Sequence, residues 1–213
     1  MKLNLKIAIA IFIIVIAIAF AATNEVCAFS MVPAPSHIHT REQISMSYGV
    51  FEPGNNWVAS SGVVNETGEE TKVLGRQVKI RYEDYNWDFV DFRFGVDMQS
   101  IDDDNLTFQS TLLVIEFCDN FWRSKKHRLI SVGTLAYSPY TIITAGHETL
   151  RGTSYKYELG FEYAYAMYKN WSFKAQTSYQ YHKLNNFQTT DVFDPSYMVI
   201  RGLGFSAGIN YIF

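Results

Sequence analysis

Over most of the chain beyond residue 41, apolar and polar side chains alternate, so that every second residue is apolar. Residues 155–168 place tyrosine, leucine, phenylalanine and methionine at the odd positions, and mainly lysine, glutamate, glycine and alanine at the even ones. Residues 171–182 repeat the pattern after a break of only Lys169-Asn170. A period of two is that of a β-strand, whose side chains point alternately to opposite faces of a sheet. Because no stretch of 41–213 shows the 3.6 period of an amphipathic helix, the pattern predicts an all-β chain.

The same alternation predicts eight strands in all. They are expected at residues 43–51, 73–83, 89–99, 107–118, 129–137, 155–168, 171–182 and 197–213. Two are irregular. In 107–118, Leu112 and Val114 fall on the face that should be polar, and in 129–137 the pattern does not show which residues share a face. Short connections at 86–87, 123–127 and 169–170 alternate with long ones at 52–72, about 141–154 and 183–196, with a modest hairpin at 100–105 as the exception. This layout predicts an eight-stranded antiparallel up-and-down transmembrane β-barrel over residues 41–213.

Alternation alone does not say which face of the strands meets water. A soluble, lipocalin-like barrel also has eight strands, with its apolar face inside. Here the strands reach the 9 to 11 residues that a tilted membrane span needs. Tryptophans lie at three short turns and tyrosines near the other rim, as two interfacial girdles would require; they are Trp87, Trp122, Trp171, Tyr140, Tyr155, Tyr181 and Tyr197. We therefore favour the membrane barrel and keep a soluble periplasmic ligand-binding barrel as an alternative.

The polar face carries charges of both signs, which would line the lumen of a membrane barrel. They include Lys79, Arg81, Asp91, Arg93, Asp97, Glu116, Glu158, Glu162 and Lys174. An unpaired ion in a low-dielectric interior is strongly disfavoured. We therefore expect Arg81 and Arg93 to lie against acidic partners among the carboxylates of this set, and the resulting charge network to plug the lumen. A narrow gated ion path is the alternative interpretation of the same residues.

The last eight residues carry a recognisable ending. Ser206 is followed two residues later by Gly208, while Tyr211 is third from last and Phe213 is last. This ending resembles the C-terminal assembly signal of bacterial outer-membrane barrels, and residues 41–213 resemble the small OmpA-like or OmpX-like barrels. The segment 43–50 and the Lys169-Asn170-Trp171 turn are similar to barrel proteins of the Bacteroidetes. The resemblance implies insertion by the barrel-assembly machinery, and it carries no catalytic residues.

The N-terminus predicts export. Lys2 and Lys6 precede the 16 uncharged, mainly apolar residues 7–22, which is the pattern of a signal peptide. Cleavage after Ala21 or after Ala28 fits the small-residue rule, and we favour Ala28. Residues 1–28 are then the signal peptide and 29–40 a periplasmic N-terminal segment. An uncleaved anchor is the alternative, although this stretch is shorter than the roughly 20 residues that span a bilayer. Cleavage at Ala28 would leave Cys118 as the only cysteine.

Residues of catalytic type are present but do not form a distinctive motif. His182 shares a face with Ser178 and could meet Glu162 across a hairpin, which are the right types for a hydrolytic triad. A polar lumen rich in such residues produces this set by chance, so we expect no catalytic residues and no enzyme. An outer-membrane lipid-modifying enzyme is the alternative function.

Ligand and metal motifs are equally weak. Residues 102–104 are three aspartates without the glycine and distal glutamate of an EF-hand, and His37 and His39 lie among prolines. We expect no metal and no cofactor. The net charge of −3, with no block of like charges long enough to follow a phosphate backbone, excludes nucleic acid as a partner.

The expected function is therefore that of an integral outer-membrane protein with a structural or adhesive role. The loops 52–72, 141–154 and 183–196 would present Trp57, Phe187 and Phe193 to an extracellular ligand. The other expected partners are outer-membrane lipid, lipopolysaccharide and, during biogenesis, the barrel-assembly machinery.

Overall fold

The computed structural model describes residues 42–54, 74–84, 91–102, 106–187 and 198–213. The described residues all lie in one compact unit, Pro35–Phe213. The predicted signal peptide, the segment 29–40 and most of the loops 52–72 and 183–196 lie outside the described residues. So do His37, His39, Trp57, Trp87, Phe193 and Tyr197.

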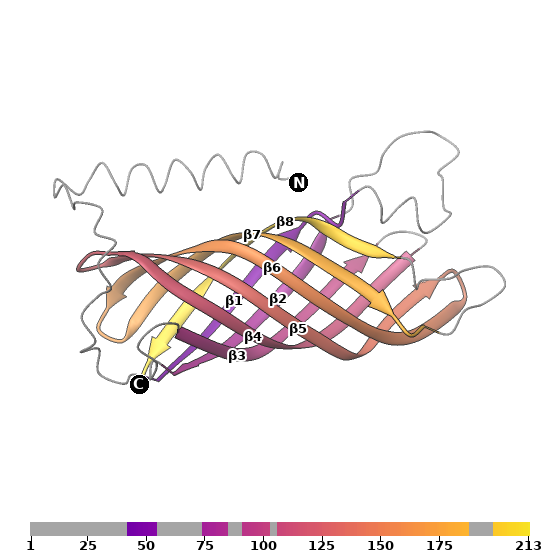
Figure 1. Ribbon diagram of the computed structural model, residues 1–213, viewed down its shortest axis with the longest axis horizontal. Helices are drawn as coiled ribbons and strands as arrows, with labels where there is room; N and C mark the ends of the chain where they lie inside the picture. Colours follow the sequence, from indigo (N-terminus) through magenta and orange to yellow (C-terminus); the bar gives the residue numbers. More distant parts are fainter. Residues whose placement is uncertain (1–41, 55–73, 85–90, 103–105, 188–197) are drawn as a thin grey trace. The chain divides into compact units, whose positions relative to one another are not determined.

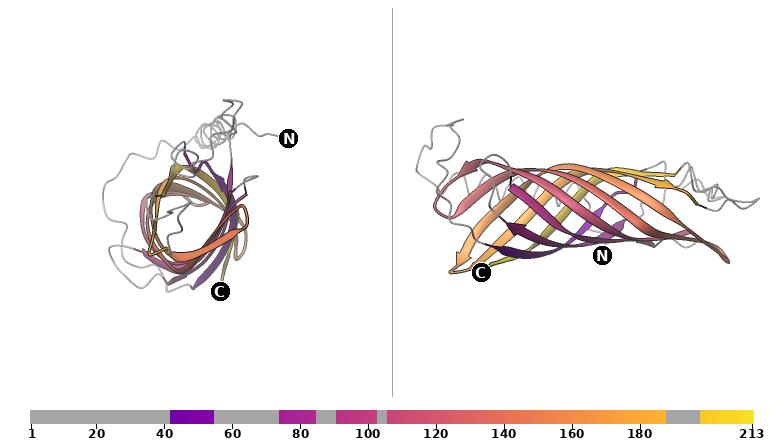
Figure 2. Two further views of the ribbon diagram at one scale, coloured as in Figure 1. Left: turned by 90° about the vertical axis from the view of Figure 1, so that its right-hand side faces the viewer. Right: turned by 60° about the horizontal axis from the view of Figure 1, so that its bottom comes forward.

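Eight antiparallel strands form a closed barrel in which each strand pairs with the next and β8 pairs with β1 (Figures 1 and 2). The strands are β1 Gln43–Phe51, β2 Gly75–Asp84, β3 Asp91–Asp102, β4 Leu106–Arg123, β5 His127–Ala145, β6 Glu148–Tyr168, β7 Trp171–Asn185 and β8 Val199–Ile212. The predicted all-β, eight-stranded antiparallel barrel is confirmed, and β1 has its predicted bounds. Among the described residues, no helix is both long and apolar enough to cross a membrane.

The register of the ladder fixes the tilt of the strands. A row of paired residues that starts at Asp91 returns to the same strand at Ile101 after one circuit, a stagger of ten residues. The row passes through Cys118, Val132, Gly160, Ser178, Gly204, Phe51 and Gly75. With eight strands, this stagger and the usual strand spacing give a tilt of about 40°. An eight-stranded barrel leaves an interior just wide enough for its own side chains.

The described turns and the C-terminus identify the two rims of the barrel. At one end, the short-turn rim, lie the β4–β5 turn at 124–126, the β6–β7 turn at Lys169-Asn170 and the terminal residue Phe213. The other end, the opposite rim, carries the β5–β6 turn at Gly146-His147. The predicted long loop at 141–154 was wrong, because these residues form the ends of β5 and β6. A register shift between Ser138 and Thr141 interrupts the alternation there, which hid the strand from the sequence pattern.

The apolar face of the barrel is on the outside. Phe161 and Leu159 expose 54% and 73% of their surfaces, whereas Arg93 and Glu162 expose 1% and 5%. This is the reverse of a soluble barrel, whose apolar side chains converge on the interior. Leu112 and Val114 explain the irregular strand, since both point inward and pack with Ala136.

Candidate functional site

The interior of the barrel has two sections of opposite chemistry. The ionic section consists of ten buried charged side chains: Lys79, Arg81, Glu83, Arg93, Asp97, Glu116, Lys156, Glu158, Glu162 and Lys174. The apolar section is a cluster of buried residues towards the opposite rim: Phe51, Ile101, Leu106, Phe108, Ile143, Leu150, Leu184, Phe187, Met198 and Ile200. Strand parity produces the ionic section and most of the apolar section, because these residues occupy the inward positions of their strands. Phe187 and Met198 lie just beyond the ends of β7 and β8.

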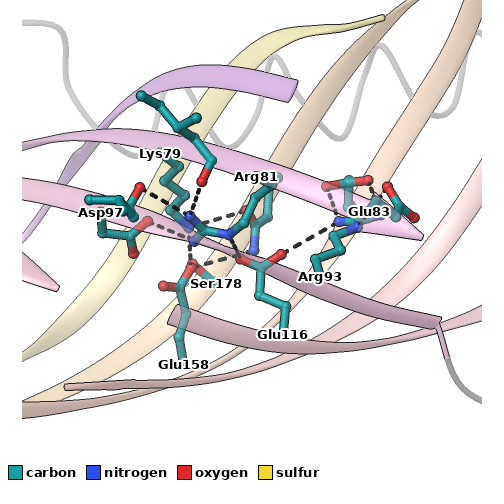
Figure 3. A network of polar contacts seen from close by, with 12 residues as sticks. Lys79, Arg81, Glu83, Arg93, Asp97, Glu116, Glu158 and Ser178 are labelled. Atoms are coloured by element: carbon teal, nitrogen blue, oxygen red, sulfur yellow. Dashed lines mark hydrogen bonds and ion pairs between the residues drawn. The ribbon is translucent and has the colours of Figure 1, made fainter. Parts of the chain in front are cut away.

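Arg93 on β3 is paired with three carboxylates (Figure 3). Its Nη1 and Nη2 donate to the two oxygens of Glu162 at 2.8 and 2.9 Å, a bidentate pair. Its Nε lies 3.1 Å from Glu83 Oε2, and its Nη1 lies 3.6 Å from Glu116 Oε2. The planar guanidinium suits this arrangement because it presents five donors in a fixed fork.

Arg81 on β2 links this group to the next. Its Nε donates to Glu116 Oε1 at 2.7 Å, and its Nη2 lies 2.6 Å from Asp97 Oδ1. Its Nη1 also donates to the backbone carbonyl of Ile80 at 3.0 Å. Glu116 is thus shared between Arg81 and Arg93, so the two arginines belong to one network.

Glu158 on β6 is the centre of the remaining contacts. It lies 2.5 Å from Lys79 Nζ and 3.0 Å from Lys156 Nζ, and it accepts a hydrogen bond from Ser178 Oγ at 2.6 Å. Lys156 also contacts Asp97. Lys174 lies 3.5 Å from Glu83 and 3.4 Å from Glu162.

The ionic section is electrically balanced, since it holds five basic and five acidic side chains and each contacts at least one opposite charge. A cavity of about 20 Å³ remains beside it, lined in part by Ser45, Ser47 and Ser206. That volume holds about one water molecule. With its charges paired and little space left beside them, the ionic section can brace the barrel from within.

Eight of the nine charged residues singled out in the sequence lie in the ionic section. The ninth, Asp91, lies half-buried at the short-turn rim and accepts a hydrogen bond from Asn120 Nδ2 at 2.7 Å. Glu83 and Lys156 complete the section and were not in the predicted set. Both lie on the polar face of their strands, so strand parity alone could have found them.

The structure does not assemble the triad of Ser178, His182 and Glu162. Ser178 donates to Glu158, Glu162 pairs with Arg93, and His182 contacts Gln99 at 3.1 Å. In the register, His182 lies opposite Lys156, whereas Glu162 lies opposite Gln176, six residues away along β7. Within the described residues, no group of three histidine, cysteine, aspartate or glutamate side chains could hold a metal ion.

One loop expectation is wrong. Phe187 was expected to face the exterior, but it is 7% exposed and packs in the apolar section against the backbone of Gly152. Gly152 has no side chain, which leaves the space that the Phe187 ring fills.

The four residues of the C-terminal ending lie on both faces of β8. Ser206 points inward, and Gly208 pairs with Ser47 across the β1–β8 seam. Tyr211 packs on Trp171 with 4.9 Å between ring centroids and on Phe213 with 5.3 Å.

An apolar exterior, a charge-balanced interior and a closed eight-stranded antiparallel ladder together define the class of the fold. It is a closed barrel similar to those of outer-membrane proteins.

The chain aligns with several solved structures, and the first of those described next supports this class at the level of fold. A major outer membrane protein from Thermus thermophilus aligns with a TM-score of 0.50 and 15% identity, covering 81% of this chain and 99% of that one. Neisserial surface protein A aligns with a TM-score of 0.47, 15% identity and coverage of 82% and 97%. Ail, the attachment invasion locus protein of Yersinia pestis, aligns with a TM-score of 0.45 and 15% identity, covering 83% of this chain and 100% of that one. No protein-family model and no curated protein matches the chain.

Proposed function

We propose that the chain is an integral protein of the bacterial outer membrane, with a structural or surface-binding role and a lumen that does not conduct. The observation that carries the proposal is the inverted polarity of the barrel. Large apolar side chains cover its outside, while ten charged side chains are paired within. Acyl chains solvate such an exterior, and water does not.

Surface binding is supported by the hairpin at the opposite rim. The β5–β6 hairpin around Gly146-His147 carries exposed Tyr140 and Arg151, and the Arg151 guanidinium lies over the Tyr140 ring at 5.5 Å. A cation above an aromatic ring, on a rigid two-stranded support, is a suitable contact point for a partner. The adhesive part of the proposal is tested by whole-cell binding after the tip residues 144–149 are replaced by a glycine-serine turn.

Two substitutions test the membrane assignment. Phe161→Lys places a charge in the middle of the exterior and should destabilise the barrel in lipid vesicles by about 2–4 kcal/mol, the cost near the bilayer midplane. Tyr140→Lys, the matched control near the opposite rim, should cost at most about 1 kcal/mol. The measurement is the free energy of unfolding from a denaturant titration. Equal, small effects of both substitutions would show that the exterior faces water.

Conductance tests the closed lumen. In planar bilayers, the heat-modifiable form of the purified protein should give no open events of porin size. Regular openings would overturn the plug and favour the gated path.

A further inference from the structure

A cluster of basic residues lies at the short-turn rim. The basic turn, residues Arg123–Arg128, contains Arg123, Lys125, Lys126 and Arg128, and no acidic residue occurs anywhere between Asp119 and Glu148. The Ala166 amide donates to the Lys126 carbonyl at 2.7 Å, which brings the neighbouring turn with Lys169 beside it. Lys125, Lys126 and Lys169 are all exposed. The two turns therefore present three accessible ammonium groups at one place on the rim, at the end of the barrel where the C-terminus lies (Figure 1).

Aromatic side chains lie directly above the basic turn on the exterior. The His127 ring lies 6.4 Å from Trp122 and 5.1 Å from Tyr165, and its Nδ1 is 2.7 Å from the Tyr163 hydroxyl. Such amphipathic rings are found at the level of the lipid headgroups. Since the lysines lie just beyond this aromatic cluster, they are at the depth of the phosphate groups.

A groove on the barrel exterior begins a short distance above the aromatic cluster. It has a volume of about 440 Å³ and runs over β5, β6, β7 and β8, lined in part by Ser131, Gly133, Leu159, Phe161, Tyr179 and Leu203. Its floor exists because Ser131 and Gly133 are small, whereas Leu159 and Phe161 project beside them. The groove follows a row of paired residues, Val132–Gly160–Ser178–Gly204. Because the strands are tilted, this row lies farther from the short-turn rim at β8 than at β5. Its end on β5 is four to six residues from His127.

We propose that the basic turn and this groove form one binding site for an anionic diacyl phospholipid. The headgroup phosphate contacts Lys125, Lys126 and Lys169, and one acyl chain lies in the groove past Gly133. This rests on the proposed function, because it requires the exterior to face acyl chains. Each lysine near an anionic lipid surface contributes about 1 kcal/mol, so three together select clearly for an anionic headgroup. On the outward surface of the described strands, Asp119 is the acidic residue nearest to the turn in register, and its single charge cannot neutralise the cluster.

The headgroup contact is tested by lipid retention. The full chain, expressed in a bacterial host and extracted from its membranes, is placed in nanodiscs of phosphatidylcholine with a minor fraction of phosphatidylglycerol. Native mass spectrometry then counts the lipids that stay bound. We expect phosphatidylglycerol to be retained over phosphatidylcholine by about tenfold or more, and this preference to be lost in Lys125→Gln/Lys126→Gln/Lys169→Gln.

A triple variant at the opposite rim is the matched control. Arg76→Gln/Lys183→Gln/Arg201→Gln also removes three exposed cations, and it should keep the full preference. If both triple variants lose the preference for phosphatidylglycerol equally, the preference reflects the overall charge of the protein, and the proposed site is refuted. Displacement of phosphatidylglycerol by soluble glycerol 3-phosphate would overturn the lipid as the ligand.

The groove is tested separately. A Cβ at Gly133 would meet only Leu159 Cδ2, at 3.7 Å, and the Phe117 carbonyl oxygen, at 4.0 Å. The backbone therefore accepts a side chain here, and Gly133→Leu directs that side chain into the groove. This variant should lower phosphatidylglycerol retention severalfold, whereas Ala207→Leu, outward on β8 but outside the groove, should not. Equal retention in the two variants would remove the groove from the site.

Heat-modifiable migration of every variant separates the two levels of the argument. A wild-type chain that never forms the heat-modifiable barrel in lipid would refute the proposed function itself. A chain that forms it but retains both lipids equally would refute only this inference.

Discussion

The ionic and apolar sections fill the same lumen by different physical means. In the ionic section, Arg93 meets three carboxylates at 2.8 to 3.6 Å, and its two hydrogen bonds to Glu162 require each donor to face a particular acceptor. In the apolar section, residues such as Leu184 and Met198 pack against neighbours without directional contacts. Burial of a charge is favourable only while its partners remain, whereas the gain from burying an apolar side chain is roughly proportional to its area. The first section should therefore be sensitive to chemistry and the second to volume.

The largest effect is expected at Arg93. Arg93→Met keeps much of the volume but leaves Glu83, Glu116 and Glu162 without their shared cation, and removing one partner of a buried pair costs about 3–5 kcal/mol. Arg93→Lys keeps the charge and loses the bidentate fork, so it should also be clearly destabilised. The measurement is the free energy of unfolding in lipid vesicles. A wild-type value for Arg93→Met would mean that the ionic section does not stabilise the barrel.

A somewhat smaller effect is expected in the apolar section. Leu184→Ala should cost about 3 kcal/mol through lost contacts and a residual cavity. The control Leu184→Met conserves volume and should cost less than about 1.5 kcal/mol. The contrast with Arg93→Lys is the test, because a conservative change should be tolerated here and not there. If Leu184→Met were as harmful as Arg93→Lys, the two sections would not differ in kind.

The smallest effect is expected at Ser178, which supports the ionic section with a neutral donor. Ser178→Ala removes the hydrogen bond to Glu158 but leaves Lys79 and Lys156 in place, so the loss should be about 1–2 kcal/mol. Ser172, another buried serine on β7, accepts a hydrogen bond from Asn210 Nδ2 and bonds to no charged side chain in the part of the chain that the structure describes, so Ser172→Ala serves as the control. An equal loss in both would show that the carboxylate adds nothing to the contribution of Ser178.

The sequence predicts the barrel well because strand parity is a local property. Each inward-pointing charge could be identified from its neighbours in the chain, as the predicted eight in the ionic section show. The partners could not, since Arg93 and Glu162 lie on different strands and meet only across the lumen. Their pairing depends on the stagger of all eight strands, and this stagger cannot be derived from the residues of any one strand. Phe187 was misassigned for a related reason: the space it fills is created by Gly152, a distant residue on another strand.

The seam between β1 and β8 is built from small residues on its inner side. Gly49 lies opposite Ser206 and Gly208 opposite Ser47, and a methyl group on Gly208 would come within 2.1 Å of the Met46 carbonyl oxygen. The first and last strands thus leave the centre of the tube to the long lysine and arginine side chains reaching over from the other walls. A substitution that places a larger side chain on the inner side of this seam would displace a cation from its carboxylate or prevent β1 and β8 from pairing. The place where the chain joins its own beginning therefore tolerates little added bulk.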